Sequence, residues 1–328
     1  MHKYLLTIIL VLAAVSVVYA DEAVISHRVL TEDGVEIYYE TQGEGIPILM
    51  IAGGPGGNPE FMKYTHKLWL AYGQLVFVHN RGRGLSQNLD SLGKTAYSVQ
   101  TDILDLEAIR KDLKADKIIV YGHSYGGLPA LLYSAEYPEH CLAVMTTGTL
   151  SGARAWQIQN IDGIKYFLQR HFPDEWKNIK ELHDRGVLTS SDEYDDVWPS
   201  LTEVYYCNPD NAARMSAIWK DSQNDSIPAF NRNVYYSIVG DDPEWTVSGT
   251  VSGFEITDYL PQTTCPALIM GGRYDRVCPP LAQQEMAAAI ADSRLRIFDK
   301  SGHRPFIEEP VLFFEITGEF LRTVIRTE

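Results

Sequence analysis

The sequence has few cysteines, no run of basic residues and no internal repeat. In its 328 residues, 28 lysines and arginines stand against 43 aspartates and glutamates, so the formal net charge is −15. Binding to nucleic acid requires a basic surface, and this balance therefore argues against a nucleic-acid partner. The length suits one large domain or one domain with an insertion.

The four cysteines match no zinc motif in their spacing, and neither a metal nor another cofactor is expected. Cys141 and Cys265 lie in or beside strand-like segments, where a buried free thiol is the simpler interpretation. An exported protein could instead pair its cysteines, and the sequence leaves both alternatives open.

Long hydrophobic runs are absent except at the N-terminus. Residues 4–20 are uncharged, follow Lys3 and end in Val18-Tyr19-Ala20. This pattern predicts a signal peptide over residues 1–20, and hence a secreted or periplasmic protein without stable membrane association. An uncleaved membrane anchor is the less favoured alternative, because a spanning helix needs about 20 apolar residues.

The chain does contain a regular series of short apolar runs. Alternating residues around Glu32-Asp33-Gly34 predict an antiparallel hairpin. The next runs are mostly apolar, which is typical of buried parallel strands: Ile48–Ala52, Leu75–His79, Ile118–Tyr121, Leu142–Thr146, Ala267–Gly271 and Leu295–Phe298. A helical period over Val99–Leu113 lies between two of them. The alternation predicts an α/β fold, a mostly parallel sheet with helices on both faces.

This alternation stops over residues 151–261, a segment with five of the six tryptophans and no strand-like run. We interpret it as a mainly helical cap, inserted between a first core part (21–150) and a second core part (262–328). A separate globular domain unrelated to the site is the alternative. Caps over sheet crevices are common places for ligands, which favours the cap.

Gly122-His123-Ser124-Tyr125-Gly126 stands between a predicted strand and a predicted helix. A serine at such a turn is exposed above the end of the sheet, and the flanking glycines remove side chains that would collide. Asp275 and His303 each follow a later predicted strand, so both lie at the same edge. Their chain order, Ser124, Asp275, His303, is the order expected of a nucleophile, an orienting acid and a base.

The intermediate of such a reaction needs hydrogen-bond donors for its oxyanion. The backbone N–H of Tyr125, the residue after the nucleophile, is one expected donor. The glycine-rich stretch "IAGGPGGNPE", which follows the run Ile48–Ala52, is expected to supply the other.

The motifs "GGPGG", "NRGRGLS", "GHSYGG", "GGRYDRVCP" and "SGHRPFIEEP" together resemble the proline iminopeptidases, serine exopeptidases of the α/β-hydrolase superfamily. The resemblance covers about Val35–Gly148 and Pro266–Leu321. It implies the α/β-hydrolase fold, with Ser124, Asp275 and His303 as the triad and the N–H groups of Gly54 and Tyr125 as the oxyanion hole. It further implies that a carboxylate from the cap, at Glu244, grips the substrate amine. A small proline ring needs an aromatic pocket, which Trp245 or its neighbours could line, and Glu203 is a candidate second amine ligand.

The chain departs from the family pattern at two places. Ala52 stands where the family has histidine before the glycine loop, and "HNRG" at His79–Gly82 replaces its usual Asp-Gln-Arg-Gly. Both changes are expected to alter the walls near the glycine loop, which leaves the choice of substrate open.

The favoured function is an aminopeptidase that releases N-terminal proline or another small residue from a small peptide or aminoacyl substrate. A carboxylesterase or lactonase with the same triad is the alternative, and a non-catalytic binding protein of the same fold is a third. The sequence does not indicate the oligomeric state.

Overall fold

The computed structural model describes residues 23–93, 96–195 and 202–326, and the signal peptide predicted at residues 1–20 lies outside these ranges. None of the helices within the described ranges is both long and apolar enough to cross a membrane.

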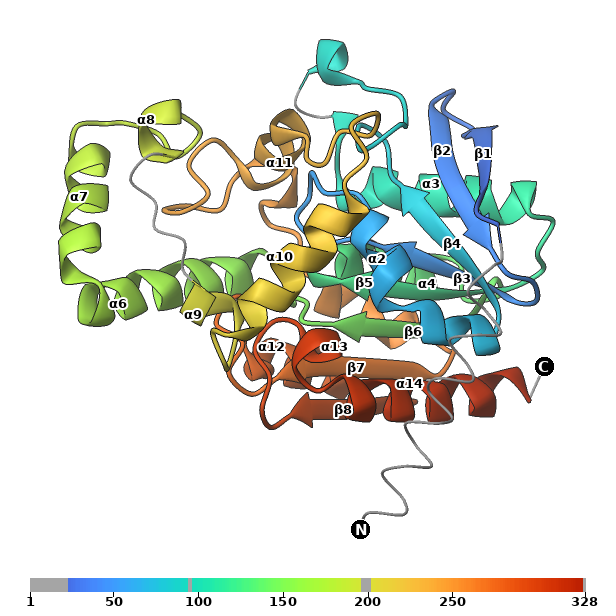
Figure 1. The fold of residues 1–328 in the computed structure, drawn as a ribbon. Helices are drawn as coiled ribbons and strands as arrows, with labels where there is room; N and C mark the ends of the chain where they lie inside the picture. Colours follow the sequence, from blue (N-terminus) through green and yellow to red (C-terminus); the bar gives the residue numbers. More distant parts are fainter. Residues whose placement is uncertain (1–22, 94–95, 196–201, 327–328) are drawn as a thin grey trace.

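Eight strands form one sheet, which confirms the predicted fold class (Figure 1). They are β1 Ile25–Leu30, β2 Glu36–Gln42, β3 Pro47–Ile51, β4 Gln74–His79, β5 Ile118–His123, β6 Cys141–Thr147, β7 Ala267–Gly272 and β8 Ser293–Phe298. The order is β1-β2-β4-β3-β5-β6-β7-β8. β1 and β2 form the predicted antiparallel hairpin, β2 pairs antiparallel with β4, and the remaining pairs are parallel.

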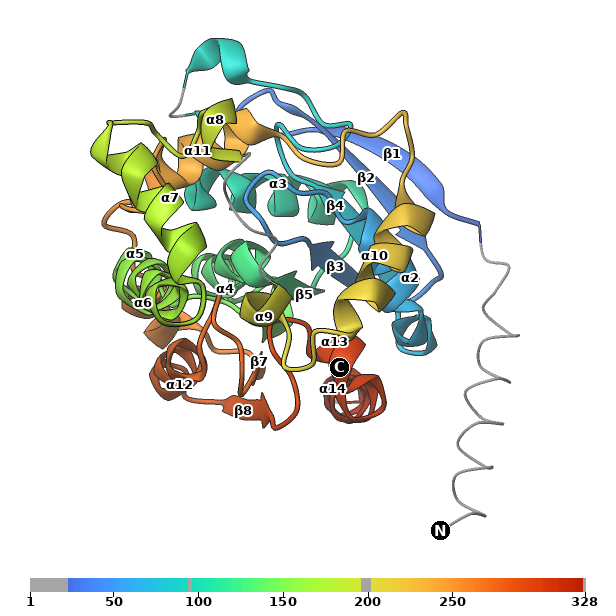
Figure 2. The ribbon, with the colours of Figure 1, turned by 60° about the vertical axis from the view of Figure 1, so that its left-hand side comes forward.

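Helices cover both faces of the sheet (Figure 2). α3 (Val99–Asp112), α4 (Gly127–Glu136) and α12 (Pro280–Ala289) lie on one side of the strands, and α2 (Glu60–Thr65) and α14 (Pro310–Ile325) lie on the other. Strand residues alternate between two apolar clusters: Leu49 and Val120 pack with the first set of helices, whereas Met50 and Tyr121 pack with the second. The inner strands β3, β5, β6 and β7 are buried on both faces, as predicted. β8 corrects the prediction for Leu295–Phe298, because it is the edge strand of the sheet and is partly exposed.

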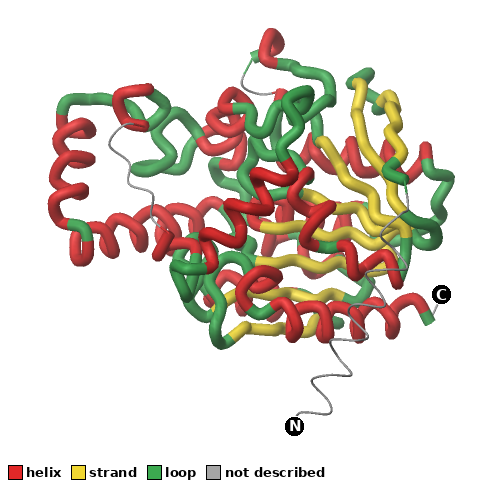
Figure 3. The backbone as a smooth tube through the Cα atoms, in the orientation of Figure 1, coloured by secondary structure: helices red, strands yellow, loops and turns green. Residues whose placement is uncertain are grey.

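The segment between β6 and β7, here called the insertion (residues 148–266), contains helices and loops and, in its described part, no strand (Figure 3). Its helices are α5 Ala153–Ala155, α6 Asp162–His171, α7 Pro173–Asp184, α8 Asp192–Asp195, α9 Thr202–Tyr205, α10 Asn211–Ser222 and α11 Arg232–Val239. Its attachment to the core includes a bridge between Phe230 and Gly57.

The strand order reverses direction between β3 and β5, because β4 lies on one side of β3 and β5 on the other. In open α/β sheets, ligands bind at the carboxyl ends of the strands at such a switch point. The two motif loops that follow β3 and β5 meet there.

Cys141 and Cys265 are buried free thiols whose sulfur atoms are 3.7 Å apart.

Candidate active site

Ser124 stands at a sharp turn from strand to helix. β5 ends at His123, one 3-10 turn spans Ser124–Gly126, and α4 follows at once. Ser124 has a φ of 56°, a left-handed conformation that costs a serine about 1–2 kcal/mol. A side chain at Gly122 would bring its Cβ within 2.1 Å of the Gly126 carbonyl oxygen, so only glycine fits. The turn leaves Ser124 half-buried, whereas its neighbours are buried.

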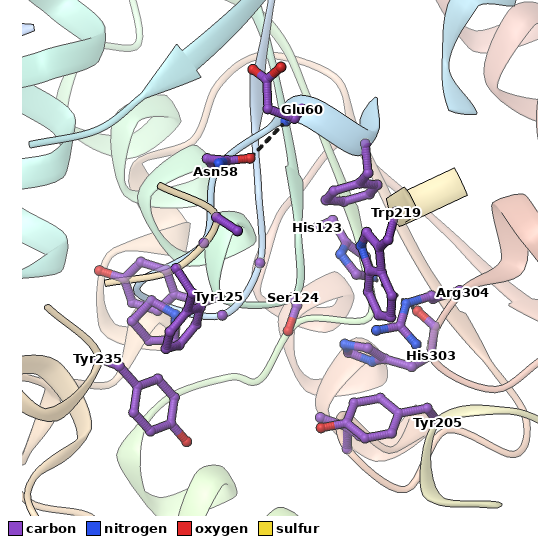
Figure 4. Close-up of a pocket in the computed structure, with 18 of the residues that line it drawn as sticks. Asn58, Glu60, His123, Ser124, Tyr125, Tyr205, Trp219, Tyr235, His303 and Arg304 are labelled. Carbon is purple, nitrogen blue, oxygen red and sulfur yellow. Dashed lines mark hydrogen bonds between the residues drawn. The ribbon is translucent and has the colours of Figure 1, made fainter. Parts of the chain in front are cut away.

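Asp275 and His303 lie on the loops after β7 and β8, as predicted, and are in contact. His303 Nδ1 and Asp275 Oδ2 are 2.8 Å apart. The other carboxylate oxygen accepts the backbone N–H groups of Val277 and Cys278 at 2.9 and 2.8 Å, which fixes its orientation. With Nδ1 donating to the carboxylate, Nε2 is the ring nitrogen left for the pocket. His303 and Ser124 line the same pocket (Figure 4).

His123, the other histidine beside Ser124, has a different position. Its Nε2 lies 3.1 Å from the backbone carbonyl oxygen of His303. Burial, together with the charge of His303, holds the pKa of His123 well below its usual value. A neutral His123 therefore donates to the His303 loop and holds it in place.

The glycine loop, residues 53–57, follows β3 and lies against Ser124. A Cβ on Gly53 would stand 2.5 Å from the Cβ of Ser124. Gly54 has a φ of 61°, which a larger residue would adopt only with strain. Arg83 donates from Nε to the carbonyl oxygen of Pro55 within this loop.

Asp102, on α3, links the glycine loop to the turn at Ser124. Its carboxylate accepts Nη1 and Nη2 of Arg83 at 2.7 and 3.0 Å, and it accepts the Tyr125 hydroxyl at 2.8 Å. All three residues are buried. We call Arg83, Asp102 and Tyr125 the strut, because together they connect the two loops that are expected to carry the oxyanion donors.

The pocket above these loops has a volume of about 1150 Å³ and is lined by both the core and the insertion. We call the glycine loop, Ser124, Tyr125 and His303 its floor. The walls carry seven aromatic side chains: Phe61, Trp156, Tyr205, Tyr206, Trp219, Phe230 and Tyr235. Four charged residues also line the pocket: Glu60, Asp225, Glu244 and Arg304. Glu60 is paired with Lys63 and Asp225 is exposed to solvent, which leaves Glu244 and Arg304 as the charges of interest.

Glu244 reaches the pocket from the loop that follows α11. Burial, and to a lesser extent the Asp242 carboxylate, raises its pKa from 4.5 to about 7. Within the ranges that the structure describes, the Glu244 side chain forms no ion pair or hydrogen bond. The sequence placed this residue in the pocket by family resemblance alone.

Two other residues predicted to bind the substrate, Trp245 and Glu203, do not line this pocket. Trp245 donates from Nε1 to the Tyr194 hydroxyl at 3.0 Å, and its ring stacks on His183 with centroids 3.7 Å apart. It belongs to an apolar cluster inside the insertion. Glu203 lies on the exposed side of α9, whose neighbouring residues line the pocket instead.

The two departures from the family pattern also lie outside the pocket lining. Ala52, His79 and Asn80 are buried, and Asn80 donates from its side-chain amide to the Asp102 carbonyl oxygen at 3.3 Å. They therefore support the loops from behind and do not form the walls, contrary to the expectation from sequence.

Two groups of side chains have spacings that could suit a metal ion: Asp275, Cys278 and His303, and Glu40, Glu60 and His79. In the second group, Lys63 Nζ donates to Glu60 at 2.8 Å and also contacts Glu40, so an ammonium already supplies the positive charge. In the first group, the Asp275 carboxylate is occupied by its three hydrogen bonds.

A family model described as "alpha/beta hydrolase fold" matches residues 46–310. The chain is 28% identical over 278 residues to a proline iminopeptidase of Lactobacillus delbrueckii subsp. bulgaricus, covering 84% of this chain and 89% of that protein. The structure of a proline iminopeptidase from Mycobacterium smegmatis superposes with a TM-score of 0.72 at 18% identity, covering 92% of this chain and 99% of that one. A thermophilic esterase from Thermogutta terrifontis superposes with a TM-score of 0.63 at 20% identity, covering 92% and 99%.

Proposed function

Because the chain belongs to the alpha/beta hydrolase fold family, we propose that it is a serine aminopeptidase, which releases N-terminal proline or another small residue from short peptides. Its similarity to proline iminopeptidases supports the peptide substrate. The arrangement of Ser124, His303 and Asp275 supports the serine mechanism.

In the proposed reaction, His303 Nε2 removes the proton from the Ser124 hydroxyl as its oxygen attacks the scissile carbonyl carbon. Asp275 holds the ring in the required tautomer and stabilises its charged form. The N–H groups of Gly54 and Tyr125 donate to the oxyanion, and removal of one such donor typically costs about 3 kcal/mol of transition-state stabilisation. His303 then gives its proton to the leaving amine, and water releases the amino acid from the acyl-enzyme.

The observation that carries the aminopeptidase proposal is the unpaired Glu244. Placing a carboxylate in a largely apolar pocket is unfavourable, and its raised pKa reflects that cost. The free α-amine of an N-terminal residue carries a positive charge that could pair with Glu244. Its binding would return Glu244 to the ionised form, and the aromatic side chains around it would contact a small ring.

The experiment compares a prolyl arylamide with a short-chain aryl ester on wild type and Glu244→Gln. If Glu244 binds the amine, the variant should lose about 10–100-fold in kcat/KM on the arylamide, the value of a charged hydrogen bond, and much less on the ester. Glu203→Gln, the same change at an exposed carboxylate outside the pocket, is the matched control. Equal losses on the two substrates would contradict amine recognition.

A carboxylesterase remains the second candidate. The triad arrangement serves ester and amide hydrolysis alike, and the pocket is wide enough for acyl groups without an amine. Ester hydrolysis that far exceeds arylamide hydrolysis in the wild type, and that does not respond to Glu244→Gln, would favour this candidate.

A further inference from the structure

Four arginines in the described ranges are buried: Arg81, Arg83, Arg110 and Arg304. The first three each pair with a buried carboxylate at 2.7 or 2.8 Å. No carboxylate in the described ranges pairs with Arg304, although it is only 9% exposed. Buried charges in proteins are normally paired, because removing them from water is costly. The buried guanidinium of Arg304 therefore lacks a carboxylate partner within the described ranges.

Aromatic rings hold the Arg304 guanidinium in place. Its central carbon lies 5.0, 5.2 and 4.9 Å from the ring centroids of Tyr205, Tyr206 and Trp219. Nη1 donates to the Tyr206 hydroxyl at 2.8 Å. A guanidinium has five N–H groups, and the bond to Tyr206 is the only side-chain hydrogen bond that Arg304 forms within the described ranges, although the residue lines the pocket. Figure 4 shows the guanidinium near His303 and Trp219.

The position beside His303 determines which part of a substrate could meet Arg304. In triad hydrolysis the histidine protonates the leaving group, so the leaving group must lie next to the His303 ring. Arg304 is the next residue in the chain and lines the same cavity. Its planar fork suits a carboxylate, to which a guanidinium can donate two parallel hydrogen bonds.

We propose that Arg304 binds a carboxylate on the leaving-group side of the scissile bond. Glu244 carries the opposite charge in the same cavity, and no ion pair forms between the two. This part of the inference rests on the amine recognition of the proposed function. Together, the charges of Glu244 and Arg304 select a substrate with both a free amine and a free carboxylate. The preferred substrate class is therefore the dipeptide with an N-terminal proline or small residue.

The test compares prolyl-glycine with prolyl-glycinamide, which differ only in the terminal carboxylate. Wild type should prefer the free acid by about tenfold or more in kcat/KM, the value of a charge-assisted hydrogen bond. Arg304→Gln should reduce this acid-to-amide ratio to near one, and Arg304→Lys should keep part of it. A general loss of folding or activity lowers both rates and leaves the ratio unchanged.

Arg273→Gln is the matched control, because it removes the same charge from the loop after β7 at an exposed residue that does not line the pocket. Its acid-to-amide ratio should equal that of the wild type. A wild-type ratio near one, or a ratio that survives in Arg304→Gln, would overturn the proposal.

A second substrate pair separates this proposal from amine recognition. 4-Acetoxybenzoate and its methyl ester release leaving groups with and without a carboxylate, and neither carries an amine. If no aminoacyl substrate is cleaved, the aminopeptidase proposal fails. The Arg304 proposal still requires Arg304→Gln to lower the ratio of the two ester rates relative to wild type. An unchanged ratio, or no hydrolysis of any of the four substrates, would reject it.

Discussion

Behind the floor of the pocket, Asp275 accepts three hydrogen bonds and Arg83 forms a two-point pair with Asp102, whereas on the walls Glu244 and Arg304 line the cavity without ionic partners among the described residues. The floor therefore has its polar groups in place before a substrate arrives, as a catalytic arrangement requires. In the two proposals above, the partners of Glu244 and Arg304 are groups of the substrate. Under the proposed function, chemistry and substrate choice belong to structurally different parts of one cavity.

Among substitutions that test this difference between floor and walls, the largest effect is expected at Ser124. Ser124→Ala should lower kcat by about 10⁴-fold or more on every substrate, whatever charges that substrate carries, because the nucleophile is lost. The variant should also fail to react with a fluorophosphonate. Ser216→Ala, a second serine that lines the pocket, is the control and should keep both properties. Unchanged turnover in Ser124→Ala would remove the serine mechanism.

Substitution of Asp102 tests whether the loops of the floor depend on the Arg83–Asp102 ion pair. Asp102→Asn leaves the buried Arg83 without an anion and should cost about 3–5 kcal/mol in the free energy of unfolding, measured with urea. The kcat should fall on peptides and esters alike, because both loops lose their connection. Asp116→Asn makes the same change at an exposed carboxylate and should do neither. Wild-type stability and kcat in Asp102→Asn would show that the loops are held by packing alone.

At Glu244, on the walls, we expect the opposite result: a substitution that weakens substrate binding should increase the stability of the fold. Its pKa rises on folding from 4.5 to about 7, so the folded protein binds a proton more tightly and loses stability relative to the unfolded chain as the pH rises through this interval. Glu244→Gln, which cannot ionise, should therefore be more stable than wild type by about 1–3 kcal/mol at pH values above this interval.

The difference between the two proteins should vanish as the pH falls to the unfolded-state value of 4.5. Thermal unfolding of wild type and variant across this range measures it, with the exposed Glu203→Gln as a control that should show no such difference. A variant less stable than wild type at high pH would mean that Glu244 has a partner in the fold.

The floor could be predicted from the sequence and the walls only in part, for a physical reason. Ser124 and Asp275 follow buried strands and His303 follows the partly exposed edge strand β8, and parallel strands bring their carboxyl ends to one edge regardless of what covers them. Trp245 lies in the insertion, where helix packing decides which way a side chain points, and it turned inward to His183. Arg304 was visible in "SGHRPF", but chain adjacency to His303 did not reveal that its guanidinium lacks a carboxylate and lines the pocket.

The smallest effect, and the finest test of the floor, concerns one hydroxyl of the strut. Tyr125→Phe removes the bond to Asp102 but leaves the Arg83–Asp102 pair intact, so the loss of stability should be about 1 kcal/mol. Tyr133→Phe on α4 is closely matched, because its buried hydroxyl donates to Glu107, a carboxylate paired with Arg110, at 2.9 Å. Both variants should lose similar stability in urea. Only Tyr125→Phe should also lower kcat, by several-fold and equally on amides and esters, because only its hydroxyl positions an N–H of the floor. Equal kcat values for the two variants would limit the strut to a structural role.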